Sequence, residues 1–111
     1  MSMLPREREV RHCVDDGRDA FGDWLDALKD VSGRAAILKR IDRIEEGDFG
    51  DHRHVGIGVW ELRIHFGPGY RVYYGEEGPK VILLLCGGNK AKQRRDVAKA
   101  QRLWVNHRRL H

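Results

Sequence analysis

Residues 60–93 contain three apolar runs separated by turn-forming residues, and this stretch constrains the fold more than any other. In the first two runs, residues 60–66 and 70–74, apolar side chains recur at every second position, which is typical of strands that bury one face. Gly67-Pro68-Gly69 lies between them and predicts a hairpin loop, because glycine adopts positive φ and proline fixes its own. The third run, residues 81–85, is apolar without a break and favours a central strand covered on both faces. We therefore predict a three-stranded antiparallel meander.

The same alternation separates the side chains of the meander onto two faces. One face is apolar, and the other would gather Arg63, His65, Arg71 and Tyr73. Two arginines and a histidine side by side repel one another, and the arrangement becomes favourable if an anion such as phosphate lies among them. The alternative is that Arg63 and Arg71 are solvated charges paired with Glu61 or Glu76. The pattern leaves both interpretations open.

Two short helices are predicted before the meander. Phe21, Trp24, Leu25 and Leu28 have helical spacing and predict a helix over residues 20–29, with Asp19 as its N-cap. A second helix would have Ser32 as its N-cap and Gly47 as its C′ residue, with apolar side chains at residues 37, 38, 41 and 44. A short edge strand over residues 9–14 and a turn at residues 15–17 precede them. The helix hairpin would cover the apolar face of the sheet, which gives an α+β domain.

A basic helix is predicted after the meander. Gly87-Gly88 would end the last strand, Asn89 would cap the helix, and its outer surface would be positively charged. Lys90 would lie at the helix start, where a cation opposes the helix dipole and neighbouring amides can hold an anion. If the helix turns back beside the meander, Lys90 and Gln93 would reach the face that carries the arginines.

Charge is distributed unevenly along the chain. Residues 1–51 contain 9 Lys or Arg and 13 Asp or Glu, a balance of −4, whereas residues 52–111 contain 12 and 4, a balance of +8. The positive charge therefore accompanies the predicted sheet and last helix. Such a concentration indicates a nucleic acid or another polyanion as partner.

Other features narrow the class of protein. The length of 111 residues suits a single domain over residues 1–111, with frayed ends at 1–7 and 106–111. The two cysteines form neither a disulfide framework nor a metal-binding spacing, and His52 and His54 lack a third ligand, so residues 48–58 are predicted to be a solvated loop. No apolar run is long enough to span a bilayer, so we expect a cytoplasmic protein without a membrane partner.

Several motifs resemble a known family. Residues 61–64 (Glu-Leu-Arg-Ile), 67–74 and 83–90, with Gln93 and Asp96 beyond them, are similar to toxins of the RelE/ParE superfamily, and in particular to the HigB-like addiction module killer proteins. The resemblance covers residues 10–105. It implies a β-α-α-β-β-β-α domain, in which a small antiparallel sheet carries the two-helix hairpin on one face, together with a C-terminal helix.

The resemblance also implies a function and partners. It implies the toxin of a type II toxin–antitoxin module, held silent by a helix-turn-helix antitoxin of the HigA-like kind. It implies cleavage of messenger RNA at the ribosome, without a metal or another cofactor. ParE relatives share the fold but inhibit DNA gyrase, so a non-enzymatic toxin stays an alternative, as does a plain nucleic-acid-binding module.

A metal-free ribonuclease needs a base for the 2′-hydroxyl, cations for the charge on the phosphorane, and an acid for the departing 5′-oxygen. The resemblance assigns the basic site to Arg63, Arg71 and Lys90. The arginines would hold the phosphate, and Lys90 would be a second clamp or proton carrier. His65, the histidine near this face, would act as acid or base, with an inert cross-strand neighbour as the alternative. The C-terminal tyrosine of some RelE toxins has no counterpart, because no tyrosine follows Tyr74. The predicted RNA contacts are Lys92, Gln93, Arg94 and Tyr73.

Overall fold

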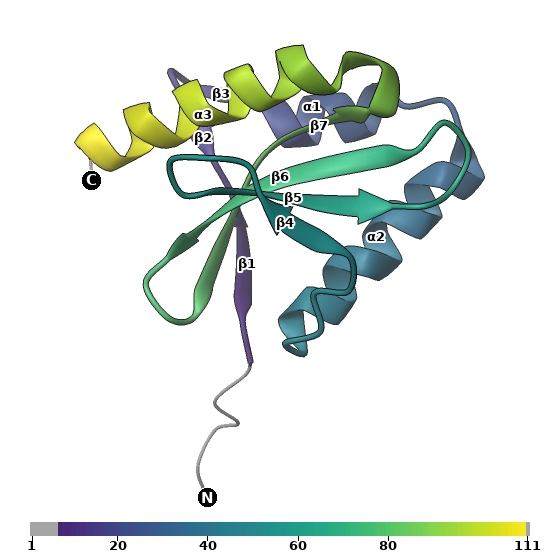
Figure 1. The fold of residues 1–111 in the computed structure, drawn as a ribbon, viewed down its shortest axis with the longest axis horizontal. Helices are drawn as coiled ribbons and strands as arrows, with labels where there is room; N and C mark the ends of the chain where they lie inside the picture. Colours follow the sequence, from purple (N-terminus) through teal and green to yellow (C-terminus); the bar gives the residue numbers. More distant parts are fainter. Residues whose placement is uncertain (1–6, 111) are drawn as a thin grey trace, which may run out of the picture.

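The computed structural model describes residues 7–110, which form a five-stranded sheet between two helical layers (Figure 1). The elements in chain order are β1 (Glu9–His12), β2 (Val14–Asp15), β3 (Arg18–Asp19), α1 (Ala20–Ala27), α2 (Val31–Glu45), β4 (His52–His54), β5 (Val59–Ile64), β6 (Tyr70–Glu77), β7 (Val81–Asn89), a 3-10 turn η1 (Lys90–Lys92) and α3 (Gln93–Leu110). The strand order is β1-β7-β6-β5-β4, and only β1 runs parallel to its neighbour. The predicted α+β class and the meander are confirmed, although the sheet is mixed.

One core lies between the sheet and the hairpin of α1 and α2. Leu62, Val72 and Tyr74 from the sheet are buried against Phe21 and Ile37 from the helices. These sheet residues are the apolar face predicted from the alternation. The helix hairpin therefore covers the face that the sequence assigned to it.

A second core lies on the opposite face, under α3. Trp104 and Ala100 of α3 pack with Leu83, Leu85 and both cysteines. Cys13 and Cys86 are buried free thiols, and burial raises the pKa of Cys86 to about 12, so that it stays protonated at neutral pH. This helix covers only part of the face, and the uncovered part lies where α3 begins.

The N-cap residues of the first two helices are both aspartates. Asp19 caps α1 as predicted, since its side chain accepts from the Gly22 amide at 2.9 Å. For α2 the prediction of Ser32 was wrong, because Asp30 accepts from the Gly33 amide at 2.9 Å and also from the Tyr70 hydroxyl at 2.6 Å. The second bond ties the start of α2 to the start of β6.

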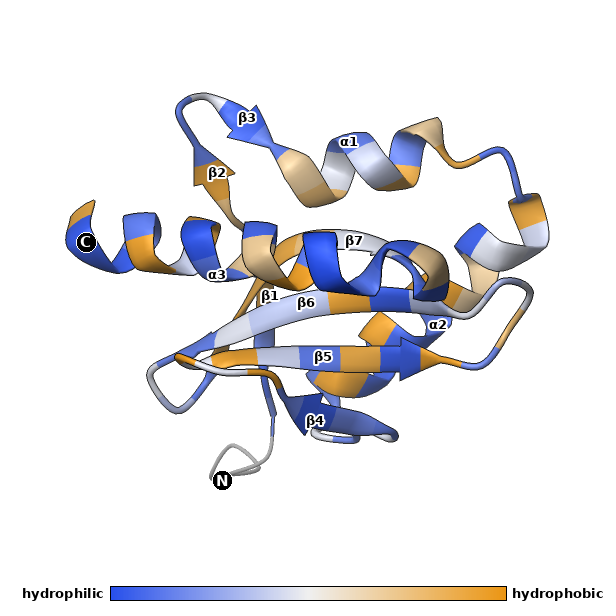
Figure 2. Cartoon of the chain, turned by 45° about the horizontal axis from the view of Figure 1, so that its top comes forward, coloured by the Kyte–Doolittle hydropathy of each residue, from blue (hydrophilic) through white to orange (hydrophobic). Residues whose placement is uncertain are grey.

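Two further boundaries differ from the sequence prediction. Residues 48–58 are not wholly a loop, because β4 forms an edge strand there, hydrophilic along its length (Figure 2). The α3 helix continues to Leu110 and so extends through most of the segment 106–111 that was expected to fray. Residues 1–6 of the expected frayed start and residue 111 lie outside the described residues. Among the helices described, none has both the length and the apolar character needed to cross a membrane.

Glycines in β6 and β7 let tryptophans pack directly on the sheet. A Cβ placed on Gly87 would lie 2.3 Å from Trp24 of α1, and one on Gly75 would lie 2.4 Å from Trp104 of α3. Both distances are far below van der Waals contact. In each helical layer, a tryptophan ring therefore packs directly on a glycine of the sheet.

We predict that Gly87→Ala lowers the free energy of unfolding by about 1–3 kcal/mol, because the added methyl overlaps the Trp24 ring. Urea denaturation measures the change. In a Trp24→Leu background the same substitution should cost clearly less, because the overlapping ring is gone. An equal cost in both backgrounds would contradict this account.

Candidate functional site

An open pocket of about 560 Å³ lies between the β5–β6 hairpin and the start of α3. Its walls are the hairpin loop, residues 66–69, and the side chains of Arg63, His65, Arg71, Lys90 and Gln93. We call it the hairpin pocket. The structure thus brings together all four residues predicted to be catalytic, and one of the predicted RNA contacts.

Strand register and one backbone hydrogen bond bring these residues together. Arg63 of β5 lies opposite Arg71 of β6, and Arg71 lies opposite Gly88 of β7. The amide of Lys90 donates to the Gly69 carbonyl at 2.8 Å, which joins the start of η1 to the hairpin loop. The lysine therefore stands at the same end of the sheet as the two arginines.

Gly88 also allows the first turn of α3 to approach the sheet. A Cβ there would lie 1.9 Å from Oδ2 of Asp96, which is itself buried. Burial raises the pKa of Asp96, and its Oδ2 has no hydrogen-bond partner among the described residues. Glycine at position 88 thus keeps α3 close to Arg71.

Arg71 is a buried cation of the pocket wall that has no hydrogen-bonded anion among the described residues. It is 7% exposed, it has no hydrogen bond or ion pair within residues 7–110, and its Nε is buried without a partner. Burying an unpaired guanidinium costs free energy, and the register places a second arginine directly opposite it. An anion in the pocket would satisfy it.

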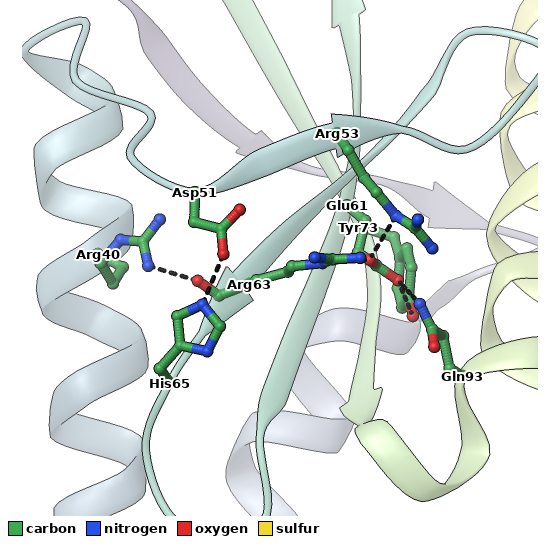
Figure 3. Close-up of polar contacts among 8 residues, drawn as sticks. All are labelled: Arg40, Asp51, Arg53, Glu61, Arg63, His65, Tyr73 and Gln93. Atoms are coloured by element: carbon green, nitrogen blue, oxygen red, sulfur yellow. Dashed lines mark hydrogen bonds and ion pairs between the residues drawn. The ribbon is translucent and has the colours of Figure 1, made fainter.

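Glu61 lies fully buried beside the pocket and collects donors from four elements (Figure 3). The bonds to its carboxylate come from Arg53 Nε of β4 at 3.3 Å, Arg63 Nε of β5 at 3.1 Å, the Tyr73 hydroxyl of β6 at 3.0 Å and Gln93 Nε2 of α3 at 2.8 Å. Sequence reasoning considered Glu61 only as an ion-pair partner of the arginines. That alternative holds for Arg63, whereas Arg71 bonds neither Glu61 nor Glu76.

The environment of Glu61 keeps it ionised. Burial by itself raises the pKa of this carboxyl, but the hydrogen bonds from Gln93, Arg63 and Tyr73 outweigh burial, so its pKa lies below the ordinary value. The nearby charge of Arg71 lowers it further. Glu61 is therefore an anion that holds the surrounding donors in place.

His65 is oriented by an acidic residue from the segment before β4. Its Nε2 lies 2.5 Å from Oδ2 of Asp51, and this bond is the main reason why the pKa of Asp51 is lowered (Figure 3). The Asp51 carbonyl accepts from the Arg63 amide at 2.9 Å. Arg40 of α2 donates to the carbonyls of Arg63 and Phe49 at 2.5 and 2.8 Å, which fixes the same segment. The imidazole keeps Nδ1 without a partner in the described part of the chain.

The remaining predicted RNA contacts lie in three different environments. Tyr73 is fully buried, and its hydroxyl donates to Glu61, so the prediction that its ring meets RNA was wrong. Burial strongly raises its pKa. Arg94 is exposed and lines a neighbouring pocket between β4 and α3. Lys92 is also exposed, but it lines neither that pocket nor the hairpin pocket. The described residues contain no group of three or more His, Cys, Asp or Glu that could hold a metal ion.

The chain belongs to the family of phage-derived Gp49-like proteins (DUF891), whose model matches residues 23–104. It is 43% identical over 83 residues to an uncharacterized protein of Haemophilus influenzae, and the match covers 75% of this chain and 84% of that protein. The Gp49-like family is associated with toxin–antitoxin modules and is related to addiction module toxins. The matched region contains the whole hairpin pocket.

We predict that Glu61→Gln lowers the free energy of unfolding at pH 7 by about 3 kcal/mol, because it leaves Arg63 and Arg71 beside each other without an anion. The pKa of Glu61 is below its ordinary value of 4.5 in the folded state, so its contribution is complete above about pH 4.5 and is lost as the pH falls through the folded-state pKa. The difference between wild type and variant should therefore shrink from pH 7 to about pH 3.

Denaturant unfolding at several pH values tests this dependence. Glu76→Gln removes an exposed carboxylate from β6 and serves as the matched control, with an expected change within about 0.5 kcal/mol. A destabilisation by Glu61→Gln that stays constant between pH 7 and pH 3 would show that the charge of Glu61 is not responsible.

Proposed function

We propose that this member of a toxin–antitoxin-associated family is the toxin of a type II module and a metal-free endoribonuclease that cleaves messenger RNA, as its resemblance to HigB-like toxins implies. The observation that supports this most directly is the buried, unpaired guanidinium of Arg71 in the wall of the hairpin pocket. A phosphodiester is the polyanion whose oxygens match a planar guanidinium. The partners are a cognate antitoxin and messenger RNA on the ribosome.

In this proposal the scissile phosphate lies among Arg71, Arg63 and Lys90. Arg71 donates to the non-bridging oxygens, and it has no other partner to give up. Arg63 is already bonded to Glu61 through Nε, so only its terminal nitrogens are available for the phosphate. Arg63 is fixed by Glu61 before the substrate arrives, and the three cations stabilise the extra negative charge of the phosphorane.

His65 is the candidate base. With Nε2–H held by Asp51, its Nδ1 can accept the proton of the 2′-hydroxyl, much as a carboxylate orients an imidazole in hydrolases. The 2′-oxygen then bonds to phosphorus while the bond to the 5′-oxygen breaks. Lys90 donates a proton to this leaving oxygen. The products are a 2′,3′-cyclic phosphate and a 5′-hydroxyl.

We predict that Arg71→Ala abolishes growth inhibition in cells and lowers RNA cleavage at least about 100-fold, because a main stabiliser of the phosphorane is lost. The thermal midpoint of the variant should equal or exceed that of wild type, since an unpaired buried charge has been removed. Growth assays, cleavage assays and thermal melts give the three measurements. Binding to the antitoxin should persist.

The matched control is Arg95→Ala, which removes an exposed arginine from α3 outside the hairpin pocket. This variant should remain toxic. An Arg71→Ala protein that still arrests growth would overturn the assignment. One that is inactive but unfolded would exclude the claim that Arg71 reduces stability.

We also predict that induction of the protein creates new messenger RNA ends that carry a 5′-hydroxyl, because the 5′-oxygen is the leaving group. Sequencing of 5′-hydroxyl ends before and after induction measures this, with the Arg71→Ala strain as control. Unchanged messenger ends together with DNA-damage signalling would instead indicate a gyrase inhibitor.

A further inference from the structure

A second pocket, of about 400 Å³, lies beside the hairpin pocket. It is formed between β4 and the start of α3, and its walls are Arg53, His54, Val55, Gln93, Arg94 and Val97. We call it the flanking pocket. Gln93 belongs to the walls of both pockets, so the two are adjacent and the amide of Gln93 stands between them.

Arg53 and Arg63 approach Glu61 from neighbouring strands, which brings one cation of each pocket to the same carboxylate. Their Nε atoms lie 3.3 and 3.1 Å from the same carboxylate oxygen, so they are at most 6.4 Å apart. Only Nε of Arg53 bonds Glu61, and its terminal nitrogens point away from the carboxylate (Figure 3).

The flanking pocket also offers apolar surface. Val55 and Val97 are half-buried and pack against the core under α3. His54 contributes to the pocket wall from β4, but its ring faces the other side of the sheet, where it contacts the Trp60 ring at 5.2 Å between centroids. Val55 and Val97 therefore make up the apolar surface of the flanking pocket. A flat apolar group could lie against these side chains, with cations on both sides.

We propose that the flanking pocket binds the nucleotide next to the scissile phosphate, so that the substrate is single-stranded RNA spanning both pockets. Arg53 and Arg94 contact the neighbouring phosphate, and the base lies against Val55 and Val97. This inference rests on the proposed function. It extends that function by adding a second phosphate contact, from Arg53, that sequence reasoning did not identify. A nucleotide combines an anion with a flat ring, and the flanking pocket presents groups for both.

The experiment compares two 2′-O-methyl oligoribonucleotides that cannot be cleaved, a dinucleotide with one phosphate and a trinucleotide with two. Their affinities for the full chain, freed of antitoxin, are measured by fluorescence anisotropy at fixed salt. Wild type should bind the trinucleotide about tenfold more tightly, because a second phosphate gains charged hydrogen bonds. Arg94→Ala should remove this gain and leave dinucleotide affinity unchanged, whereas the neighbouring Arg95→Ala should keep the gain.

The remaining outcomes separate the two proposals. If Arg71→Ala weakens both oligonucleotides while Arg94→Ala leaves the tenfold ratio intact, the flanking-pocket proposal is overturned and the proposed function survives. If wild type binds neither oligonucleotide, or binds both equally, the flanking-pocket proposal is overturned, whereas the proposed function is decided separately by the 5′-hydroxyl ends formed in cells. If Arg94→Ala weakens only antitoxin binding, the flanking pocket belongs to a protein interface and the proposal is again overturned.

Discussion

The buried carboxylate of Glu61 organises the end of the sheet that carries the hairpin pocket. Its four hydrogen bonds come from β4, β5, β6 and α3, so one anion fixes the relative positions of an edge strand, two central strands and the last helix. The same anion neutralises part of the positive charge that the strand register concentrates there. It bonds Arg63 and Arg53 but leaves Arg71 without a hydrogen bond. Arg71 therefore has no hydrogen-bonded anion among the described residues, and its side chain lines the hairpin pocket.

Local sequence patterns predicted the scaffold and the meeting of the basic residues. The period of two, the Gly67-Pro68-Gly69 loop and the resulting register place Arg63 opposite Arg71, and the cap at Asn89 starts the turn that carries Lys90. The role of Glu61 was not predictable in this way, because its bond to Gln93 spans 32 residues. The burial of Tyr73 was missed because it depends on how far α3 reaches over the sheet. Strand β4 was missed because its three side chains are all polar and show no alternation.

Uncompensated charge links stability to binding. Burying the Arg71 guanidinium without a hydrogen-bond partner costs free energy, and any anion that binds only the folded state recovers part of that cost by mass action. A nucleic acid strand would do so, and so would an acidic segment of a partner protein. The basic half of the chain, with its balance of +8 over residues 52–111, provides the long-range attraction for either.

The bond between the Lys90 amide and the Gly69 carbonyl has a consequence for how such sites diverge among relatives. Gly69 has a φ of +81°, and it ends the connection of five residues, 65–69, between β5 and β6. The length of this connection therefore sets the distance from Lys90 to the arginine pair. Lengthening the loop by one residue would displace the lysine even with all three basic side chains retained. Loop length, as much as the identity of the cations, therefore defines which homologous chains can build this pocket.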